Sequence, residues 1–159
     1  MSKLAIYLGD HYAASVAAVA LARRAAASNR EGRAGEVLAT LADEIEEDRQ
    51  TLELIMQRLD IRPDRTKVAV AWSAEKLVRL KLNGQLTGYS PLSRLEELEI
   101  LALGVTGKLA LWQALRHAAT HGIPEAELQT LIKRARSQRR RLERQRLEAA
   151  VEALSDTST

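Results

Sequence analysis

The chain has 159 residues, which fits a single domain that buries roughly two thirds of the surface exposed by its unfolded chain. Apolar residues make up 46% of it, but phenylalanine is absent and aromatic residues reach only 3%, so Leu, Ala, Val and Ile must build the core. The absence of cysteine excludes disulfides and thiolate metal sites. A net charge of +3 does not by itself indicate a nucleic-acid partner, because 24 basic residues face 21 acidic ones.

The first predicted helix covers residues 3–28 and is apolar almost all round, which is typical of a helix buried by several neighbours. Its stretch 4–22 is also similar to a secretion signal or a membrane span. Asp10 and His11 lie in the middle of that stretch, however, and an Asp near a membrane centre costs about 3 kcal/mol. We therefore expect a buried helix in a cytoplasmic protein that does not associate with membranes.

The second predicted helix covers residues 34–59. Its apolar positions are spaced by three and four residues, as one face of a helix requires, and they are Leu38, Leu41, Ile45, Leu52, Ile55 and Leu59. Pro63 prevents its continuation, because the residue before a proline avoids the helical region. A shorter third helix is predicted over residues 64–82.

Ser90 and Pro91 predict the start of a fourth helix, since serine is a good N-cap and proline suits the first helical position. We expect this helix to run over residues 91–121, with Gly122 as its C-cap. Pro124 opens a fifth helix that runs to about residue 154, and residues 155–159 are expected to be a frayed tail.

This order predicts an all-α fold, an antiparallel four-helix bundle in one domain over residues 1–154, with the shorter helix in the crossover. The helix order and the stretch from Leu41 to Leu52 resemble the small bacterial members of the ferritin-like superfamily. That resemblance implies a dinuclear iron or manganese site, held by a Glu from two helices and a Glu-x-x-His from the other two. The chain as a whole is also similar to a group of bacterial hypothetical proteins, a likeness that implies no function.

The sequence departs from that ligand pattern. None of its three histidines, His11, His117 and His121, has a Glu three residues before it. In the second helix, Glu47 is followed three residues later by Gln50, where the pattern has a histidine. We therefore predict that the chain has no native dinuclear iron site and no ferroxidase activity.

Asp48 is unusual because the apolar positions of the second helix place it on the apolar face. A carboxylate there needs a partner or it becomes protonated. One interpretation is a divergent metal or acid–base site that contains Glu44, Asp48 and His11. The other, which we favour, is a buried polar contact that fixes the helix register, with His11, Gln138 or Gln145 as the partner.

Other residues in the fourth helix have competing interpretations. His117 and His121 are four residues apart and would share a face that could hold one ion, but we interpret them as cations that suit a helix C-terminus. Gly104 and Gly107 lie inside the helix, and we expect them to permit close packing against the Ala-rich first helix. Trp112 could line a small pocket with Tyr89, but we interpret both as core residues.

The last helix carries a basic patch: Arg134, Arg136, Arg139, Arg140, Arg141 and Arg144. Such a patch could bind the phosphates of a nucleic acid. The interpretation that we favour is a solvated face, because Glu143 and Glu148 offer ion pairs within the helix. No aromatic residue is interleaved with these arginines, which argues against stacking on single strands.

These observations favour a noncatalytic helical bundle without a cofactor, which acts through self-association or a protein partner. Two alternatives stay open. One is a divergent ferritin-like protein that binds a divalent metal at Glu44, Asp48 and His11, and the other is a nucleic-acid-associated protein that uses the last helix.

Overall fold

The computed structural model describes residues 2–63 and 89–155, which form four helices and contain no strand. The helices are α1 (Lys3–Ser28), α2 (Gly32–Arg58), α4 (Pro91–His117) and α5 (Glu125–Leu154). The prediction of an all-α fold is confirmed for these residues. The shorter helix predicted over residues 64–82 and the tail after residue 155 lie outside the described residues.

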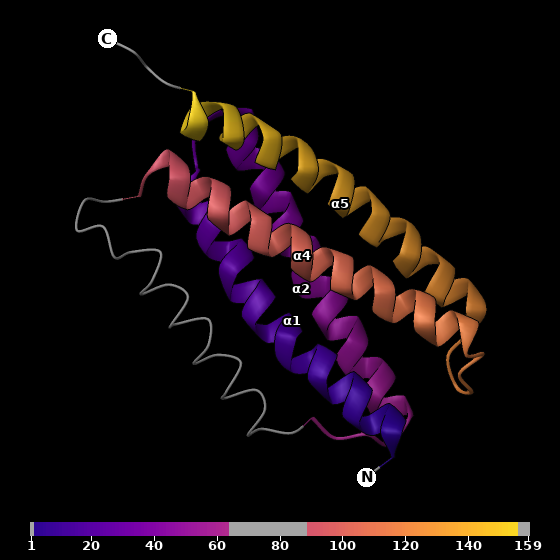
Figure 1. Ribbon diagram of the computed structural model, residues 1–159. Helices are drawn as coiled ribbons and strands as arrows, with labels where there is room; N and C mark the ends of the chain where they lie inside the picture. The colour runs from indigo at the N-terminus through magenta and orange to yellow at the C-terminus, as the bar shows by residue number, and fades with distance from the viewer. Residues whose placement is uncertain (1, 64–88, 156–159) are drawn as a thin grey trace.

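The four helices pack as a bundle in which α1 and α5 run in one direction and α2 and α4 in the other (Figure 1). The contacting pairs are α1–α2, α4–α5, α1–α4 and α2–α5, so each helix is antiparallel to both of its neighbours. The last residues of α2 and the first residues of α4 lie at opposite ends of the bundle. The predicted antiparallel four-helix bundle is therefore confirmed.

Most helix ends lie within two residues of their predicted positions. At the start of α4, the Ser90 hydroxyl accepts a hydrogen bond from the Ser93 amide at 3.1 Å, and Pro91 is the first helical residue. This is the N-cap that the sequence predicts. Helix α2 begins two residues earlier than expected, at Gly32.

The prediction that α4 reaches residue 121 is wrong, because it ends at His117. Ala119 adopts a left-handed conformation with φ of 46°, and the Thr120 amide donates to the Leu115 carbonyl at 3.2 Å. This is the Schellman arrangement, in which the residue after the C-cap turns the chain away from the helix. Gly122 also has positive φ, but it lies in the loop. His121 is outside the helix, so it does not share a helical face with His117.

The core is built mainly from aliphatic side chains, as the composition predicts. One apolar cluster, which contains Trp112, Ile55 and Leu131, fills one part of the bundle, and a second cluster, which contains Leu41, Leu98 and Leu142, fills the other. Trp112 is buried as expected, but Tyr89 is exposed, so the expectation that Tyr89 lies in the core is wrong.

By length and composition, α1 and α4 are each apolar enough to cross a membrane.

Gly104 and Gly107 do not mark a close approach of two backbones. Gly104 faces α1, but a Cβ built on it would meet Ala18 Cβ at 4.0 Å, which is ordinary van der Waals contact. A Cβ built on Gly107 would meet nothing within 4 Å. Gly104 therefore lies against Ala18 of α1, although an alanine would also fit there, whereas the expectation that Gly107 permits close packing against α1 is wrong.

Candidate functional site

A polar layer crosses the bundle between the two apolar clusters. Asp48 is 2% exposed and lies in α2 between Ile45 of one cluster and Leu52 of the other. Lys108 in α4 and Gln138 in α5 occupy the equivalent positions between apolar residues of their own helices. Three helices thus each contribute one polar side chain to the same level of the core.

These side chains form a closed set of contacts, which we call the Asp48 cluster: Asp48, Lys108, Arg134 and Gln138. The Lys108 ammonium pairs with the Asp48 carboxylate and donates to Gln138 Oε1 at 2.6 Å. The Gln138 amide donates to Asp48 Oδ2 at 2.9 Å, and Arg134 pairs with the other Asp48 oxygen. Gln138 was one of the three partners predicted from sequence, whereas Lys108 and Arg134 were not predicted.

The charges of the Asp48 cluster are balanced when the neighbouring Glu47 is included. Arg134 also pairs with Glu47 at 3.1 Å, so two carboxylates face two cations. Burial lowers the pKa of Lys108, and the neighbouring Asp48 carboxylate opposes that shift. A buried carboxylate that pairs with two cations and accepts a hydrogen bond from an amide is typical of a structural ion cluster.

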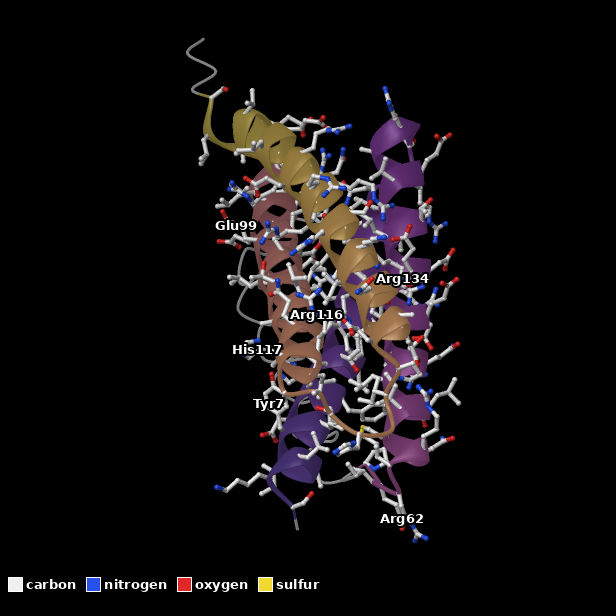
Figure 2. All side chains as sticks on the ribbon, turned by 90° about the vertical axis from the view of Figure 1, so that its right-hand side faces the viewer. Tyr7, Arg62, Glu99, Arg116, His117 and Arg134 are labelled. Atoms are coloured by element: carbon white, nitrogen blue, oxygen red, sulfur yellow. The ribbon has the colours of Figure 1, made fainter. Side chains whose placement is uncertain are left out.

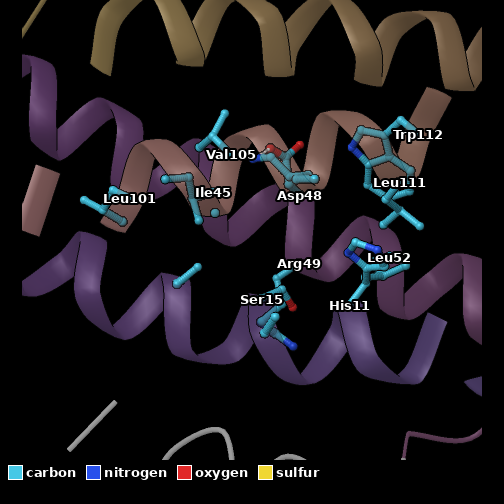
Figure 3. A pocket seen from close by; sticks show the side chains of 14 residues that line it. His11, Ser15, Ile45, Asp48, Arg49, Leu52, Leu101, Val105, Leu111 and Trp112 are labelled. Atoms are coloured by element: carbon cyan, nitrogen blue, oxygen red, sulfur yellow. Dashed lines mark hydrogen bonds and ion pairs between the residues drawn. The ribbon is translucent and has the colours of Figure 1, made fainter. Parts of the chain in front are cut away.

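The residues of the predicted metal site are separated into different contacts. Asp48 faces Lys108 and Arg134, and Glu44 pairs with Arg141 of α5. His11 and Asp48 line a common cavity (Figure 3), but the His11 ring packs edge-on against Tyr7, with 4.8 Å between ring centroids. Burial lowers the pKa of His11, although Asp10 opposes that shift. Among residues 2–63 and 89–155, no group of three His, Asp or Glu side chains is placed to hold a metal ion.

A second buried carboxylate, Glu97, lies between α1 and α4 and was not predicted. It is 0% exposed, and Arg24 of α1 pairs with it at 2.8 Å. The Tyr89 hydroxyl donates to its other oxygen at 3.0 Å and accepts from the Asn29 amide at 2.9 Å. Burial raises the pKa of Glu97, and burial also raises the pKa of Tyr89 to about 12. These contacts join the end of α1 to the start of α4.

The predicted basic patch divides into two groups. Arg134, which Figure 2 shows between α5 and α2, and Arg141 face α2 and pair with its carboxylates. The other four arginines are exposed and make no ion pair within the described part of the chain: Arg136, Arg139, Arg140 and Arg144. The predicted pairing within the helix occurs between Glu143 and Arg146, at 2.7 Å. The uncommitted positive charge is therefore smaller than the sequence suggests.

Comparison with protein-family models, with curated proteins and with solved structures gives no match for this chain.

Proposed function

We propose that this chain is a noncatalytic helical-bundle protein, ferritin-like in the order of its helices, that works by associating with a second copy of itself. The observation that carries the noncatalytic part is the position of Lys108. Its ammonium lies between Asp48 and Gln138, at the centre of the bundle. A fixed cation there repels a metal ion and already occupies the carboxylate that would bind it.

The ferritin-like part of the proposal is supported by the helix directions. In such folds one connection runs the length of the bundle, which makes the second and third long helices parallel. Here α2 and α4 run in the same direction, and α1 and α5 run in the opposite one. A ferritin-like bundle that had lost its metal site would keep these helix directions. It would have paired charges at its centre in place of the metal.

We place the protein in the cytoplasm, without a membrane segment. Although α1 and α4 are apolar enough to span a bilayer, α1 packs against α2 and α4, and α4 packs against α5 and α1. Helix α5 carries eight Lys and Arg residues between positions 133 and 146, far too many for a hydrocarbon environment.

Self-association is proposed through the outer face of α4 and α5, which we call the α4–α5 face. It exposes large apolar side chains that a monomer would leave in water: Leu92, Leu103, Leu147, Val151 and Leu154. Leu103 is 72% exposed and lies at a groove between the two helices. The rim of this groove has both signs of charge, with Glu99 and Glu143 on one hand and Arg139 and Arg140 on the other.

A second copy is the occupant that this surface fits best. An interface about a two-fold axis must be complementary to itself, and mixed charges around apolar residues satisfy that condition. A face of two antiparallel helices packed side by side, each about 40 Å long and about 10 Å wide, offers about 800 Å². That is the area that each partner of a standard stable interface buries.

The proposal is tested by the mass of the protein in solution, measured by light scattering after size exclusion at about 100 µM. We expect a dimer for the wild type and a monomer for Leu103→Glu, because a carboxylate at the centre of the interface would be desolvated. The matched control is Leu54→Glu, since Leu54 is also an exposed leucine, 57% accessible, but lies on α2. It should remain a dimer. A monomeric wild type, or dissociation of both variants, would overturn the proposal.

The noncatalytic part has its own test. Thermal unfolding of the wild type and of Asp48→Asn is measured with and without Mn(II), Fe(II) and Zn(II). We expect no metal-dependent rise in the wild-type melting temperature, because the Asp48 oxygens are held by Lys108, Arg134 and Gln138. A rise that disappears in the variant would establish the alternative, a divergent metal site.

Nonspecific binding of nucleic acid is a second candidate function. The observation that favours it is a stripe of exposed cations along α5. None of them makes an ion pair within the described residues, and they are Lys133, Arg136, Arg140 and Arg144. Four phosphate contacts would make the affinity for duplex DNA fall about 150-fold between 50 and 200 mM salt. Binding that discriminates sequence at physiological salt would contradict this candidate, as would an affinity that does not change with salt.

A further inference from the structure

A cavity of about 70 Å³ lies between α1, α2 and α4, next to the Asp48 cluster (Figure 3). Small residues of α1 and α4 form part of its lining, Ala14, Ala18 and Gly104. The rest of its lining combines an aliphatic wall, formed by Ile45, Leu52, Leu101, Val105 and Leu111, with the aromatic and polar residues His11, Ser15, Asp48, Arg49, Lys108 and Trp112. Because Gly104 has room for a Cβ, packing between the helices does not explain why the residue at this position is so small.

Trp112 contributes an unused hydrogen-bond donor to this cavity. Its side chain is 1% exposed, yet its indole N–H has no hydrogen-bond partner in the described part of the chain. Figure 3 shows the indole nitrogen on the edge of the ring that is turned toward Asp48. Buried indole N–H groups almost always find an acceptor, since an unpaired one loses its hydration without compensation. The site therefore lacks an acceptor.

The charges around the cavity favour a neutral occupant. Lys108 is already paired with Asp48, and Arg49 is held by Glu46 at 2.9 Å and Glu53 at 3.0 Å. The His11 ring lines the same space, and burial disfavours its protonated form. Among the residues that the structure describes, no surplus positive charge faces the cavity, so an anion would enter without a counter-charge.

We propose that this cavity is a binding site for a small neutral organic molecule, whose carbonyl or hydroxyl oxygen accepts the Trp112 indole N–H while its carbon skeleton contacts the aliphatic wall. The volume limits the part of the molecule that is enclosed. An apolar cavity of about 150 Å³ holds benzene, so about half that volume holds three or four heavy atoms. This proposal is independent of self-association, because the cavity and the α4–α5 face involve different surfaces.

The test uses acetone and acetate, which have the same planar shape and number of heavy atoms but differ in charge. The ¹⁵N–¹H resonance of the Trp112 indole is followed while each is added, and Trp112→Phe identifies that resonance by its loss. We expect acetone to shift it saturably with a Kd in the millimolar range, which is typical of ligands of about four heavy atoms. Acetate at the same ionic strength should leave it unmoved.

Two glycines in one helix provide matched variants. Gly104→Val places three carbons in the cavity and should weaken acetone binding by about tenfold or more. Gly107→Val makes the same change in α4 outside the cavity lining and should leave the affinity unaltered. If Gly104→Val does not fold, Ala18→Leu fills the same space from α1. An indole resonance that acetone does not move, that acetate moves equally, or that still responds in a folded cavity-filling variant would overturn the proposal.

Discussion

Replacing Asp48 with Asn shows how strongly the Asp48 cluster stabilises the bundle. Asn keeps the shape and one acceptor oxygen but removes the carboxylate that pairs with Lys108 and Arg134. Arg134 retains Glu47 at 3.1 Å, so most of the cost comes from Lys108, whose side chain is only 15% exposed. Removing one partner of a buried ion pair costs about 3–5 kcal/mol of unfolding free energy.

The loss of unfolding free energy in Asp48→Asn has an upper limit that depends on pH, because the unpaired Lys108 can lose its proton and become neutral. Deprotonating a lysine of ordinary pKa, about 10.4, costs about 1.4 kcal/mol for each pH unit below that value. The ceiling is therefore about 4.6 kcal/mol at pH 7 and about 2 kcal/mol at pH 9. The sign follows from proton binding. Burial lowers the pKa of Lys108 in the folded state, so the unfolded state binds more protons and stability rises with pH. Loss of the opposing Asp48 charge enlarges this effect.

The assay is urea unfolding followed by circular dichroism at pH 7 and pH 9. The set consists of the wild type, Asp48→Asn, Lys108→Met and the double variant. The double variant should cost less than the sum of the single ones, because it leaves no unpaired buried charge on that pair. Asp43→Asn is the control, since Asp43 is an exposed Asp of the same helix and should change stability by less than about 0.5 kcal/mol. A cost below about 1 kcal/mol for Asp48→Asn, or one that is equal at both pH values, would show that Lys108 does not depend on Asp48 as its buried partner.

Three further predictions concern other parts of the bundle. Gly107→Ala should raise the unfolding free energy by about 1 kcal/mol in urea titrations, because alanine is the better helix former and a Cβ there meets nothing within 4 Å; a loss of stability would contradict this. His11→Asn should flatten the decline in stability on going from pH 7.5 to 5.5: burial lowers the pKa of His11, so the folded wild type resists a proton that the unfolded chain accepts below about pH 6.5. Identical slopes in both proteins would show that His11 is not responsible. Arg24→Met should destabilise the fold by about 3–5 kcal/mol, because it leaves the fully buried Glu97 without its cation, and adding Glu97→Gln should recover part of that loss. No recovery in the double variant would contradict the role of the ion pair.

The helices were predictable from sequence because apolar spacing and capping residues are local signals. The Ser90 and Pro91 pair located the start of α4 to the residue, and the apolar positions of α2 located its inner face. The end of α4 was not predictable in the same way. The chain leaves the helix at Ala119, a residue type without turn preference, whereas Gly122 is a stronger but misleading signal three residues later. The conformation of Ala119 depends on its surroundings, which the local sequence does not contain.

The candidate site was only partly predictable. The burial of Asp48 followed from its position among apolar residues, and Gln138 was named as a partner. Lys108 was missed because the neighbouring Leu109, which is itself buried, accounts for an apolar position at this level of the helix. Lys108 is nevertheless three residues after Val105 and four before Trp112, both of which are buried. This spacing of three and four residues places Lys108 on the apolar face of its helix. Because another helix also carries an Asp on its apolar face, the two positions together indicate a buried ion pair.

Polar residues at one level of an otherwise aliphatic core determine how the helices align. Leu- and Ala-rich faces pack in several registers that differ by a helical turn, because their side chains have similar shapes. In this bundle, sliding α2 by one turn against α4 would move Asp48 away from Lys108 and place both charges against aliphatic side chains of the two apolar clusters. Each unpaired charge would then cost several kcal/mol, which is comparable with the whole stability of a domain of this size. The Asp48 cluster therefore selects one register for the helices that it connects. Asp48, Lys108 and Gln138 thus have a role in specifying the fold that requires no metal and no substrate.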